Sequence, residues 1–549
     1  MATRAGGMSV AARGVELVAL LLVAVIALST LARRLLVPYP ILLVIGGLLL
    51  GFIPGLPPVR LDPDLVFFVF LPPILWSAAY FTSFRDFRAS LRPILLLALG
   101  LVVATTAVVA AVAHAVVPGM SWAGAVVLGA IVSPPDAVAA VAILRRLRIP
   151  RRVLVILEGE SLVNDAGALI IYRTAVAAMV TGAFSLGQAA GGFVVAAAGG
   201  VAIGLVVAWL AVVTVRWLAD SMSEIAASLL APYVAWMMAE QLGTSAVLAC
   251  VAGGLLTRRA WSRAVGPTTR LQARAVWDLL VFVLNGVIFI LIGLQLRTLA
   301  RSVRPGELGA LAWEGLLVSL AAIATRLAWV PLAAWLPRLI PSLRARDPMP
   351  PWQAVAVISW TAMRGVVSLA AALALPLVAA DGQPLLLREQ IILLTFAVIL
   401  VTLVLQGLSL GPLVRRLGLP EDRTLEHEEI HARDAAVRAA LERLERLQEQ
   451  EHGVEEELAD LRSHYEARAR TIAERRADVP ASSSLAEAAF KRARYETLAA
   501  ERRALIDLRD RGAISDDVLL DLERELDLEA ARFGLATVPE PEQGTRGRG

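Results

Sequence analysis

The feature that most constrains this chain is a series of apolar blocks, each about 20 residues long, separated by short loops. About 20 apolar residues are the length that an α-helix needs to cross a bilayer. Thirteen such spans follow one another, at approximately 15–32, 36–54, 65–81, 93–117, 121–144, 153–180, 188–215, 223–241, 244–256, 275–296, 308–337, 350–378 and 389–414. The pattern predicts an all-α, polytopic membrane protein with about 13 transmembrane helices.

The composition agrees with a membrane protein and excludes several other classes. Hydrophobic residues make up 57% of the chain and charged residues only 18%, against about 45–50% and about 25% in soluble proteins. This balance excludes a disordered, collagen-like or nucleic-acid-binding protein. A single cysteine, Cys250, excludes a disulfide framework and a cysteine-based metal site.

The charges divide the chain into two domains. Residues 1–420 carry 31 arginines and 17 acidic residues, whereas residues 421–549 carry 21 basic and 31 acidic residues. With the N-terminus outside, 21 of the loop arginines fall on the inside and seven outside. Because basic loops stay in the cytoplasm, we expect a multi-pass plasma-membrane protein with its N-terminus outside and its C-terminus in the cytoplasm.

The region after Pro420 differs in character from the rest. Leucines such as Leu441, Leu444 and Leu458 recur at helical spacing among Glu and Arg. We therefore predict a charged, helical cytoplasmic tail over residues 421–549. Either a solvated helical hairpin or a regulatory or dimer-supporting module would fit this pattern, and the sequence does not identify partners for the tail.

The most informative polar residues lie where a membrane span should be apolar. Asp136 follows Pro134 and Pro135 in the middle of the span 121–144. Two prolines remove two backbone donors and prevent a continuous helix. Broken helices occur at membrane depth where they line a cavity or pack on protein, and in transporters their ends face the substrate ion. A proline kink with an aspartate at a polar interface is the alternative.

The next span carries a second group of oxygen ligands. Ser161 and Asp165 are four residues apart and share a helix face, and Asn164 lies beside them. Oxygen ligands without nearby Cys or His suit a small hard cation. Glu160 and Glu158 add carboxylates, although Glu158 can equally be an interfacial residue near the helix start.

Two arginines also lie within spans, Arg326 and Arg364. Charges at such positions are functional candidates by default. A buried guanidinium needs a carboxylate partner, and Glu160 is the natural candidate for one of the two. Snorkelling of each arginine to the membrane surface is the alternative.

A shared carboxylate site suggests a mechanism. Removal from water favours the protonated carboxyl group, whereas a cation arriving beside it favours the charged form. A site that holds either a cation or a proton, and that faces the two sides of the membrane in turn, exchanges one for the other. This hypothesis rests on Asp136 and Asp165.

The chain resembles the monovalent cation:proton antiporters, in particular the bacterial sodium/proton exchangers of the NhaP group and the animal exchangers. The resemblance covers most of residues 15–418. It rests on Gly159-Glu-Ser-Leu-Val-Asn-Asp, which is highly specific, and on Phe70-Leu-Pro-Pro-Ile-Leu, Ser133-Pro-Pro-Asp-Ala, Arg364-Gly and Val404-Leu-Gln-Gly.

The resemblance implies roles for these residues. Asp165 would be the central cation- and proton-binding residue, with Asp136 and Ser161 in the same site, and Glu160 would pair with Arg326. Arg364 would belong to a second broken helix, related to the first by an inverted repeat. Pro134 and Pro135 form the first break.

The resemblance also implies the reaction. Na⁺, with K⁺ or Li⁺ as alternatives, would exchange for H⁺ in a homodimer embedded in membrane lipid, without a cofactor and without nucleic acid. Asn164 stands where electrogenic relatives carry Asp, which implies electroneutral exchange. Such a protein would serve intracellular pH and sodium homeostasis. No phosphate-binding GxxxxGK[ST] loop is present, so transport would be driven by an ion gradient.

Three positions depart from the family pattern. Pro135 replaces a threonine, Ala137 replaces a proline, and Ser77 stands where many relatives carry a carboxylate. These changes leave the choice of ion open.

Two other functions fit parts of the pattern. A cation channel could use the same oxygen ligands without proton coupling. A membrane aspartyl protease could use Asp136 and Asp165 as a carboxylate dyad, but Asn164 and the Pro-Pro break argue against it. Ion flux coupled to proton flux distinguishes the antiporter from both.

Overall fold

The computed structural model describes most of the chain. The described residues are 10–35, 37–53, 61–147, 149–182, 184–218, 220–302, 308–378, 385, 387–419, 424–450, 455–476 and 482–532. They form α-helices, short π-helical and 3₁₀ segments, and no β-strand. The prediction of an all-α fold is confirmed.

The chain divides into two compact units, residues 1–422 and 423–549. The expected boundary after Pro420 lies at the edge of residues 420–423, outside the described part of the chain. Each unit is described separately below.

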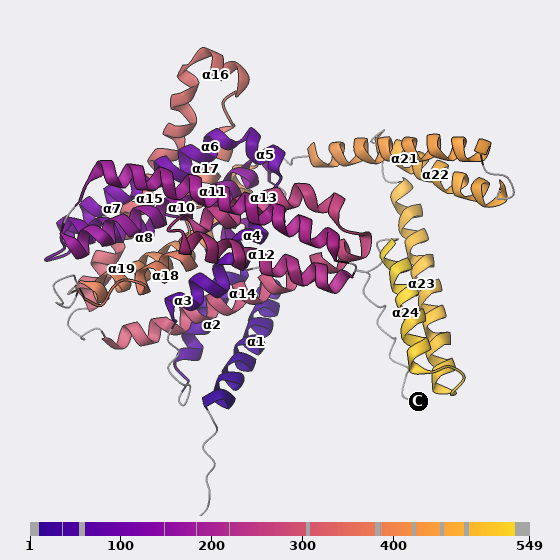
Figure 1. Ribbon diagram of the computed structural model, residues 1–549, viewed down its shortest axis with the longest axis horizontal. Coiled ribbons are helices and arrows are strands. Elements are labelled where there is room, and N and C mark those ends of the chain that lie inside the picture. Colours follow the sequence, from indigo (N-terminus) through magenta and orange to yellow (C-terminus); the bar gives the residue numbers. More distant parts are fainter. Residues whose placement is uncertain are drawn as a thin grey trace, which may run out of the picture. The chain divides into compact units, whose positions relative to one another are not determined.

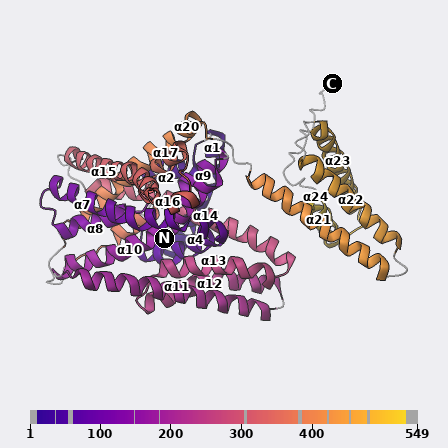
Figure 2. The same ribbon diagram turned by 90° about the horizontal axis from the view of Figure 1, so that it is seen from above.

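Helices from two separate stretches of the first unit form a bundle that we call the first bundle (Figures 1 and 2). Within it α2 packs on α14, α4 on α13, and α13 on α11 and α12. Its helices are α1 (Val10–Leu35), α2 (Tyr39–Gly51), α3 (Pro63–Leu65), η1 (Val66–Phe70), α4 (Leu71–Phe81), α11 (Leu186–Trp217), α12 (Ser221–Gln241), α13 (Ala246–Ala264) and α14 (Pro267–Ser302).

Small residues let helices of the first bundle approach closely. A Cβ atom on Gly47 of α2 would lie 2.2 Å from the carbonyl oxygen of Ile290 on α14. Gly293 of α14 is equally close to α2, because its Cβ would lie 2.1 Å from the carbonyl oxygen of Val44. Close backbone contact of this kind is the usual way in which helices pack inside a membrane.

The remaining helices of the first unit form what we call the second bundle. They are α5 (Phe84–Ala89), α6 (Leu91–Leu95), η2 (Leu96–Leu101), α7 (Val102–Val116), α8 (Trp122–Val132), α9 (Ala137–Leu144), η3 (Arg145–Leu147), α10 (Arg151–Thr181), α15 (Leu308–Trp335), η4 (Leu336–Leu339), α16 (Pro341–Arg346), α17 (Trp352–Trp360), α18 (Val366–Leu373), α19 (Arg388–Val401), η5 (Thr402–Gln406) and α20 (Gly407–Leu417). In both views α7, α8, α10 and α15 run side by side (Figures 1 and 2).

Each expected span corresponds to one helix or to a broken or continuous run of helices. Among the described residues, nine segments are long and apolar enough to cross a membrane. The helix α2 is apolar but short, α10 carries the charged run around Glu160, and α17 and α18 are separate short helices. The chain is therefore a multi-pass membrane protein, and the number of thirteen crossings stays a prediction.

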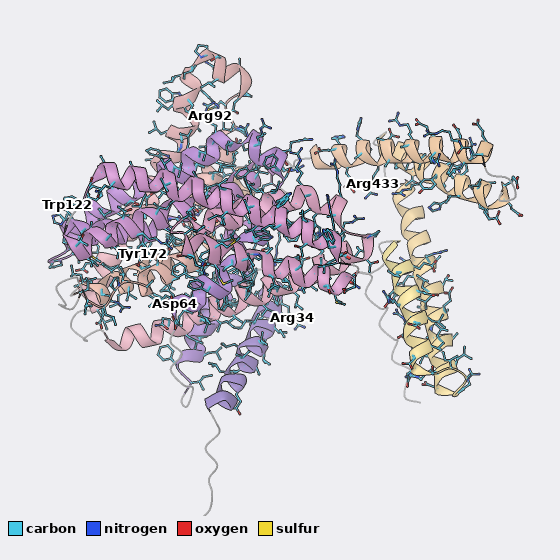
Figure 3. All side chains as sticks on the ribbon, viewed as in Figure 1. Arg34, Asp64, Arg92, Trp122, Tyr172 and Arg433 are labelled. Carbon is cyan, nitrogen blue, oxygen red and sulfur yellow. The ribbon has the colours of Figure 1, made fainter. Side chains whose placement is uncertain are left out.

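The second unit consists of two helical hairpins. One pairs α21 (Thr424–Gln450) with α22 (Glu455–Arg476), and the other pairs α23 (Ser482–Asp510) with α24 (Asp516–Arg532). Leu444 and Ile472 are buried in the first hairpin, and Leu498 in the second. The outer faces are highly charged, as Arg433 illustrates in Figure 3. A charged surface over a thin apolar seam is typical of a water-exposed helical module.

Candidate functional site

The site is built around two interrupted helices that cross. The helix α8 ends at Val132 and α9 begins at Ala137, while α17 ends at Trp360 and α18 begins at Val366. The backbone N–H of Asp136 donates a hydrogen bond of 2.7 Å to the carbonyl oxygen of Met363. This bond joins the two breaks directly.

Each break carries one charged side chain that forms hydrogen bonds with backbone groups at the interrupted helix ends. Asp136 is the N-cap of α9, where its Oδ1 accepts a hydrogen bond of 2.8 Å from the backbone N–H of Val138. A carboxylate is favourable at a helix N-terminus, which carries a partial positive charge. The carboxyl group of Asp136 therefore serves α9 as well as facing the neighbouring cavity.

Arg364 serves the opposite helix ends. Its Nε donates a hydrogen bond of 2.8 Å to the carbonyl oxygen of Val132 at the end of α8. Its Nη1 donates a second hydrogen bond to the carbonyl oxygen of Ala362, just beyond α17. The side chain is 1% exposed. The sequence predicted a carboxylate partner for a buried guanidinium. At Arg364 the partners are instead carbonyl groups at the negative ends of two helices.

Gly365 fits the crossing because it has no side chain. A Cβ atom there would lie 1.9 Å from Oδ2 of Asp136. The backbone of the second break therefore packs directly on the carboxyl group of the first. Any larger residue at this position has to displace that carboxyl group.

The helix α10 adds the second carboxylate. Asp165 is 7% exposed and lies with Asp136 and Ser161 in the lining of one cavity. Ser161 Oγ accepts a long hydrogen bond of 3.4 Å from the backbone N–H of Ala137. Asn164 Nδ2 donates a hydrogen bond of 3.0 Å to the carbonyl oxygen of Pro135. The structure thus brings Asp136, Ser161 and Asp165 to one place, with Asn164 holding the first break against α10.

The departures at Pro135 and Ser77 have visible consequences. The carbonyl group of Pro135 accepts the hydrogen bond from Asn164, so proline retains the backbone acceptor although it lacks a hydroxyl group. Ser77 lines the cavity, and its Oγ donates a hydrogen bond of 2.9 Å to the carbonyl oxygen of Ile74 on its own helix. Ser77 therefore brings a neutral hydroxyl group to the cavity wall.

Glu160 and Arg326 form a buried ion pair behind the cavity. Arg326 Nη2 lies 2.8 Å from Glu160 Oε2, and Nη1 contacts Oε1 in a bidentate arrangement. Both side chains are 1% exposed. Arg326 Nε also donates a hydrogen bond of 3.1 Å to the carbonyl oxygen of Ile358 on α17. The pair ties α10 to α15 and to the helix that leads into the second break.

The cavity has a volume of about 1010 Å³ and lies between the two bundles. The first bundle contributes α4, α13 and α14 to its walls, and the second contributes α9, α10 and α18. Four exposed arginines line its mouth, one from η3, one from α13 and two from α14, namely Arg145, Arg258, Arg270 and Arg274. The cavity reaches from this arginine-rich end of the unit to Asp136 and Asp165.

The other end of α10 is packed. Beyond Asp165, Tyr172 and Ala175 belong to an apolar cluster with residues of α8 and α19, such as Leu128 and Ile391. Between Tyr172 and Ala175, Arg173 of α10 forms a partly exposed ion pair of 2.6 Å with Glu240 of α12. The part of α10 around Tyr172 is therefore packed against neighbouring helices, and the last residue of α10 that lines the cavity is Asp165.

From the sequence we assigned no site role to Thr402, and Gln406 was named only as part of the motif Val404-Leu-Gln-Gly. Thr402 Oγ1 accepts a hydrogen bond of 3.1 Å from the backbone N–H of Arg364. Gln406 is fully buried nearby in the same chain segment, η5, and its amide atoms have no hydrogen-bond partner among the described residues. A threonine and a glutamine in an otherwise apolar span were the available signal.

Comparisons with known proteins agree with the geometry. The sequence profile described as "Sodium/hydrogen exchanger, transmembrane" matches residues 19–416. An uncharacterised Na⁺/H⁺ exchanger of Mycobacterium tuberculosis (strain H37Rv) is 37% identical over 95% of this chain and 96% of its own length. A sodium, potassium, lithium and rubidium/H⁺ antiporter of Bacillus pumilus is 33% identical over 78% of this chain and 65% of its own length.

A solved structure shows the same fold. The sodium proton antiporter MjNhaP1 from Methanocaldococcus jannaschii at pH 8 aligns with a TM-score of 0.57 and 20% identity, over 74% of this chain and 98% of that chain. The profile match covers well over half of the chain, and the mycobacterial relative extends over nearly all of it. The chain belongs to the sodium/hydrogen exchanger family.

Proposed function

We propose that this protein exchanges Na⁺, or K⁺ or Li⁺, for H⁺ across the plasma membrane at a site formed by Asp165, Asp136 and Ser161. The observation that carries this proposal is that two carboxyl groups line one cavity where two broken helices cross. The names of the relatives, which include Na⁺, K⁺ and Li⁺ among their ions, support the choice of substrate.

The two carboxyl groups explain how one site can serve both ions. Both line the same cavity, and two like charges in one desolvated site are unfavourable without a cation or a proton between them. A cation entering the site stabilises the charged carboxylates and displaces a proton, and its departure favours protonation. Asn164 adds an amide oxygen, Oδ1, that has no hydrogen-bond partner among the described residues, and it adds no charge.

Alternating access would move the second bundle against the first. The cavity follows the boundary between the bundles, and the packed end carries the Arg173–Glu240 ion pair between α10 and α12. In the proposed orientation, with the N-terminus outside, the arginine-rich mouth faces the cytoplasm and the structure is open inward. Outward opening would then require the Arg173–Glu240 pair to separate. Dimerisation, a regulatory role for the tail and electroneutral stoichiometry belong to the same proposal.

The test is a transport assay in proteoliposomes. A pH gradient is imposed, Na⁺, K⁺ or Li⁺ is added in turn, and lumenal pH is followed with and without a voltage clamp. We expect cation-dependent proton movement at a rate independent of voltage. Proton movement that changes with voltage would overturn electroneutrality, and cation flux without proton movement would favour a channel.

A further inference from the structure

A second cavity, of about 300 Å³, lies in the second bundle at the starts of α10 and α17 and at the end of α15. Its wall is largely apolar and includes Leu97, Ile156, Val330 and Ile358. Its lining also contains a charged group that we call the arginine cluster, formed by Arg92, Arg152, Arg338 and the single acid Asp347. An apolar wall beside concentrated positive charge suits an amphipathic anion.

Asp347 leaves the arginine cluster positively charged. Its Oδ1 accepts a hydrogen bond of 2.5 Å from Arg152 Nη2, and its Oδ2 accepts one of 2.7 Å from Arg338 Nη2. Arg92 is half-buried and has no ion-pair partner among the described residues. The one carboxylate thus pairs with two of the three guanidinium groups, and the charged side chains of the lining sum to +2.

Two helix ends add to this positive character. The helix α10 follows Pro150 and α17 follows Pro351, and neither proline supplies a side-chain cap. Both prolines line the cavity. The partial positive charge of each helix N-terminus therefore reinforces the arginine cluster.

The surroundings favour a lipid over a soluble anion. The segment between α15 and α17 forms a lobe around α16 (Figure 1), and Arg92 is labelled at its base in Figure 3. Leu336, Leu339, Ile340 and Met349 of this segment are each about half exposed, at 51–56%. Apolar side chains of this size beside arginines match acyl chains beside a phosphate, and basic pockets between membrane helices bind anionic headgroups.

We propose that this cavity binds an anionic phospholipid, with the phosphate held by Arg92 and Arg152 and the first acyl carbons against the apolar wall. The site lies directly behind the buried ion pair, because Ile358 both lines the cavity and accepts the hydrogen bond from Arg326. A bound lipid would therefore brace the helix that leads into the second break. This inference does not depend on the transported ion.

The test uses the purified, delipidated full-length protein in detergent. Binding of phosphatidylglycerol and of phosphatidylcholine with the same acyl chains is measured by native mass spectrometry. We expect preferential binding of phosphatidylglycerol, weakened about fivefold in Arg92→Gln and further in Arg92→Glu. The matched controls are Arg88→Gln and Arg88→Glu, which change the same charges at an exposed arginine outside the cavity and should bind as the wild type does.

A third variant tests the cavity without changing charge. Ala333→Phe fills the space from the apolar wall and should also weaken binding of phosphatidylglycerol. Unchanged binding in Arg92→Glu, or equal loss in the Arg88 and Arg92 variants, would overturn the proposal. Competition by glycerol phosphate at the same concentrations as the lipid would identify a soluble-anion site and would also overturn it.

Discussion

Glu158 and Glu160 lie two residues apart on α10 and both pair with arginine, yet their environments differ greatly. Glu160 and its partner Arg326 are each 1% exposed. Glu158 lines the cavity at 21% exposure, and its partner Arg145, at 2.8 Å, is 62% exposed. Because neighbouring helix positions point in different directions, one helix presents one glutamate to the protein interior and the other to the cavity.

The difference teaches what each pair contributes. A buried pair has no water to replace a lost partner, so removing one side leaves an uncompensated charge. An exposed pair is screened and each partner can be hydrated. We therefore infer that Glu160–Arg326 is part of the frame of the site, whereas Glu158–Arg145 adjusts the electrostatics of the cavity mouth.

The largest effect is expected for Arg326→Ala. This change leaves the Glu160 carboxylate buried without its partner and should destabilise the protein by about 3–5 kcal/mol. Thermal unfolding in detergent measures the loss. Adding Glu160→Gln to the same variant should recover part of it, because the unpaired charge is then removed. Unchanged melting of Arg326→Ala would show that the pair does not support the fold.

Gly365→Ala tests the close contact between the two helix breaks by adding a methyl group, without changing any charge. The added methyl group meets Oδ2 of Asp136, and overpacking of this kind costs about 1–3 kcal/mol. We expect lower thermal stability and weaker cation-dependent proton transport in proteoliposomes. The control is Gly309→Ala on α15, where a Cβ meets no atom within 4 Å. Similar behaviour of the two variants would contradict the close contact between the breaks.

For Asp347→Asn we expect a loss of stability between the losses expected for the buried pair and for the exposed pair. Burial raises its pKa, but hydrogen bonds and charge from Arg152 and then Arg338 outweigh burial and hold the pKa below its ordinary value. A lowered pKa in the folded state stabilises the protein above the ordinary value of about 4, and this contribution is lost as pH falls through the lowered pKa. Unfolding of wild type and Asp347→Asn should therefore differ at neutral pH and converge in acid. A constant difference down to about pH 2 would contradict this.

The smallest effect is expected for Arg145→Ala. Exposed ion pairs contribute about 0–1 kcal/mol, so melting should change little. The change in the charge of the cavity mouth should instead alter the apparent cation affinity of transport, more at low salt than at high salt. A loss of stability as large as that of Arg326→Ala would remove the distinction between the two glutamates.

The sequence predicted much of the fold because the relevant signals are local. Apolar blocks marked the helices, Pro134-Pro135 marked the first break, and Ser161 and Asp165 shared a face by spacing alone. The second break lacks proline, and its position at residues 361–365 depends on contacts with Asp136 and Thr402. Of the two carbonyl partners of Arg364, Ala362 is two residues away, but Val132 is 232 residues away in the sequence. No local pattern can encode the second contact.

The most direct test of the central claim is proton release on cation binding. Na⁺ is added to the purified protein in weakly buffered detergent solution, and released protons are measured with a pH-sensitive dye for wild type, Asp165→Asn and the cavity-mouth variant Glu158→Gln. If Asp165 binds the cation and the proton in competition, wild type and Glu158→Gln release protons and Asp165→Asn does not. Equal proton release from Asp165→Asn and wild type would contradict the account.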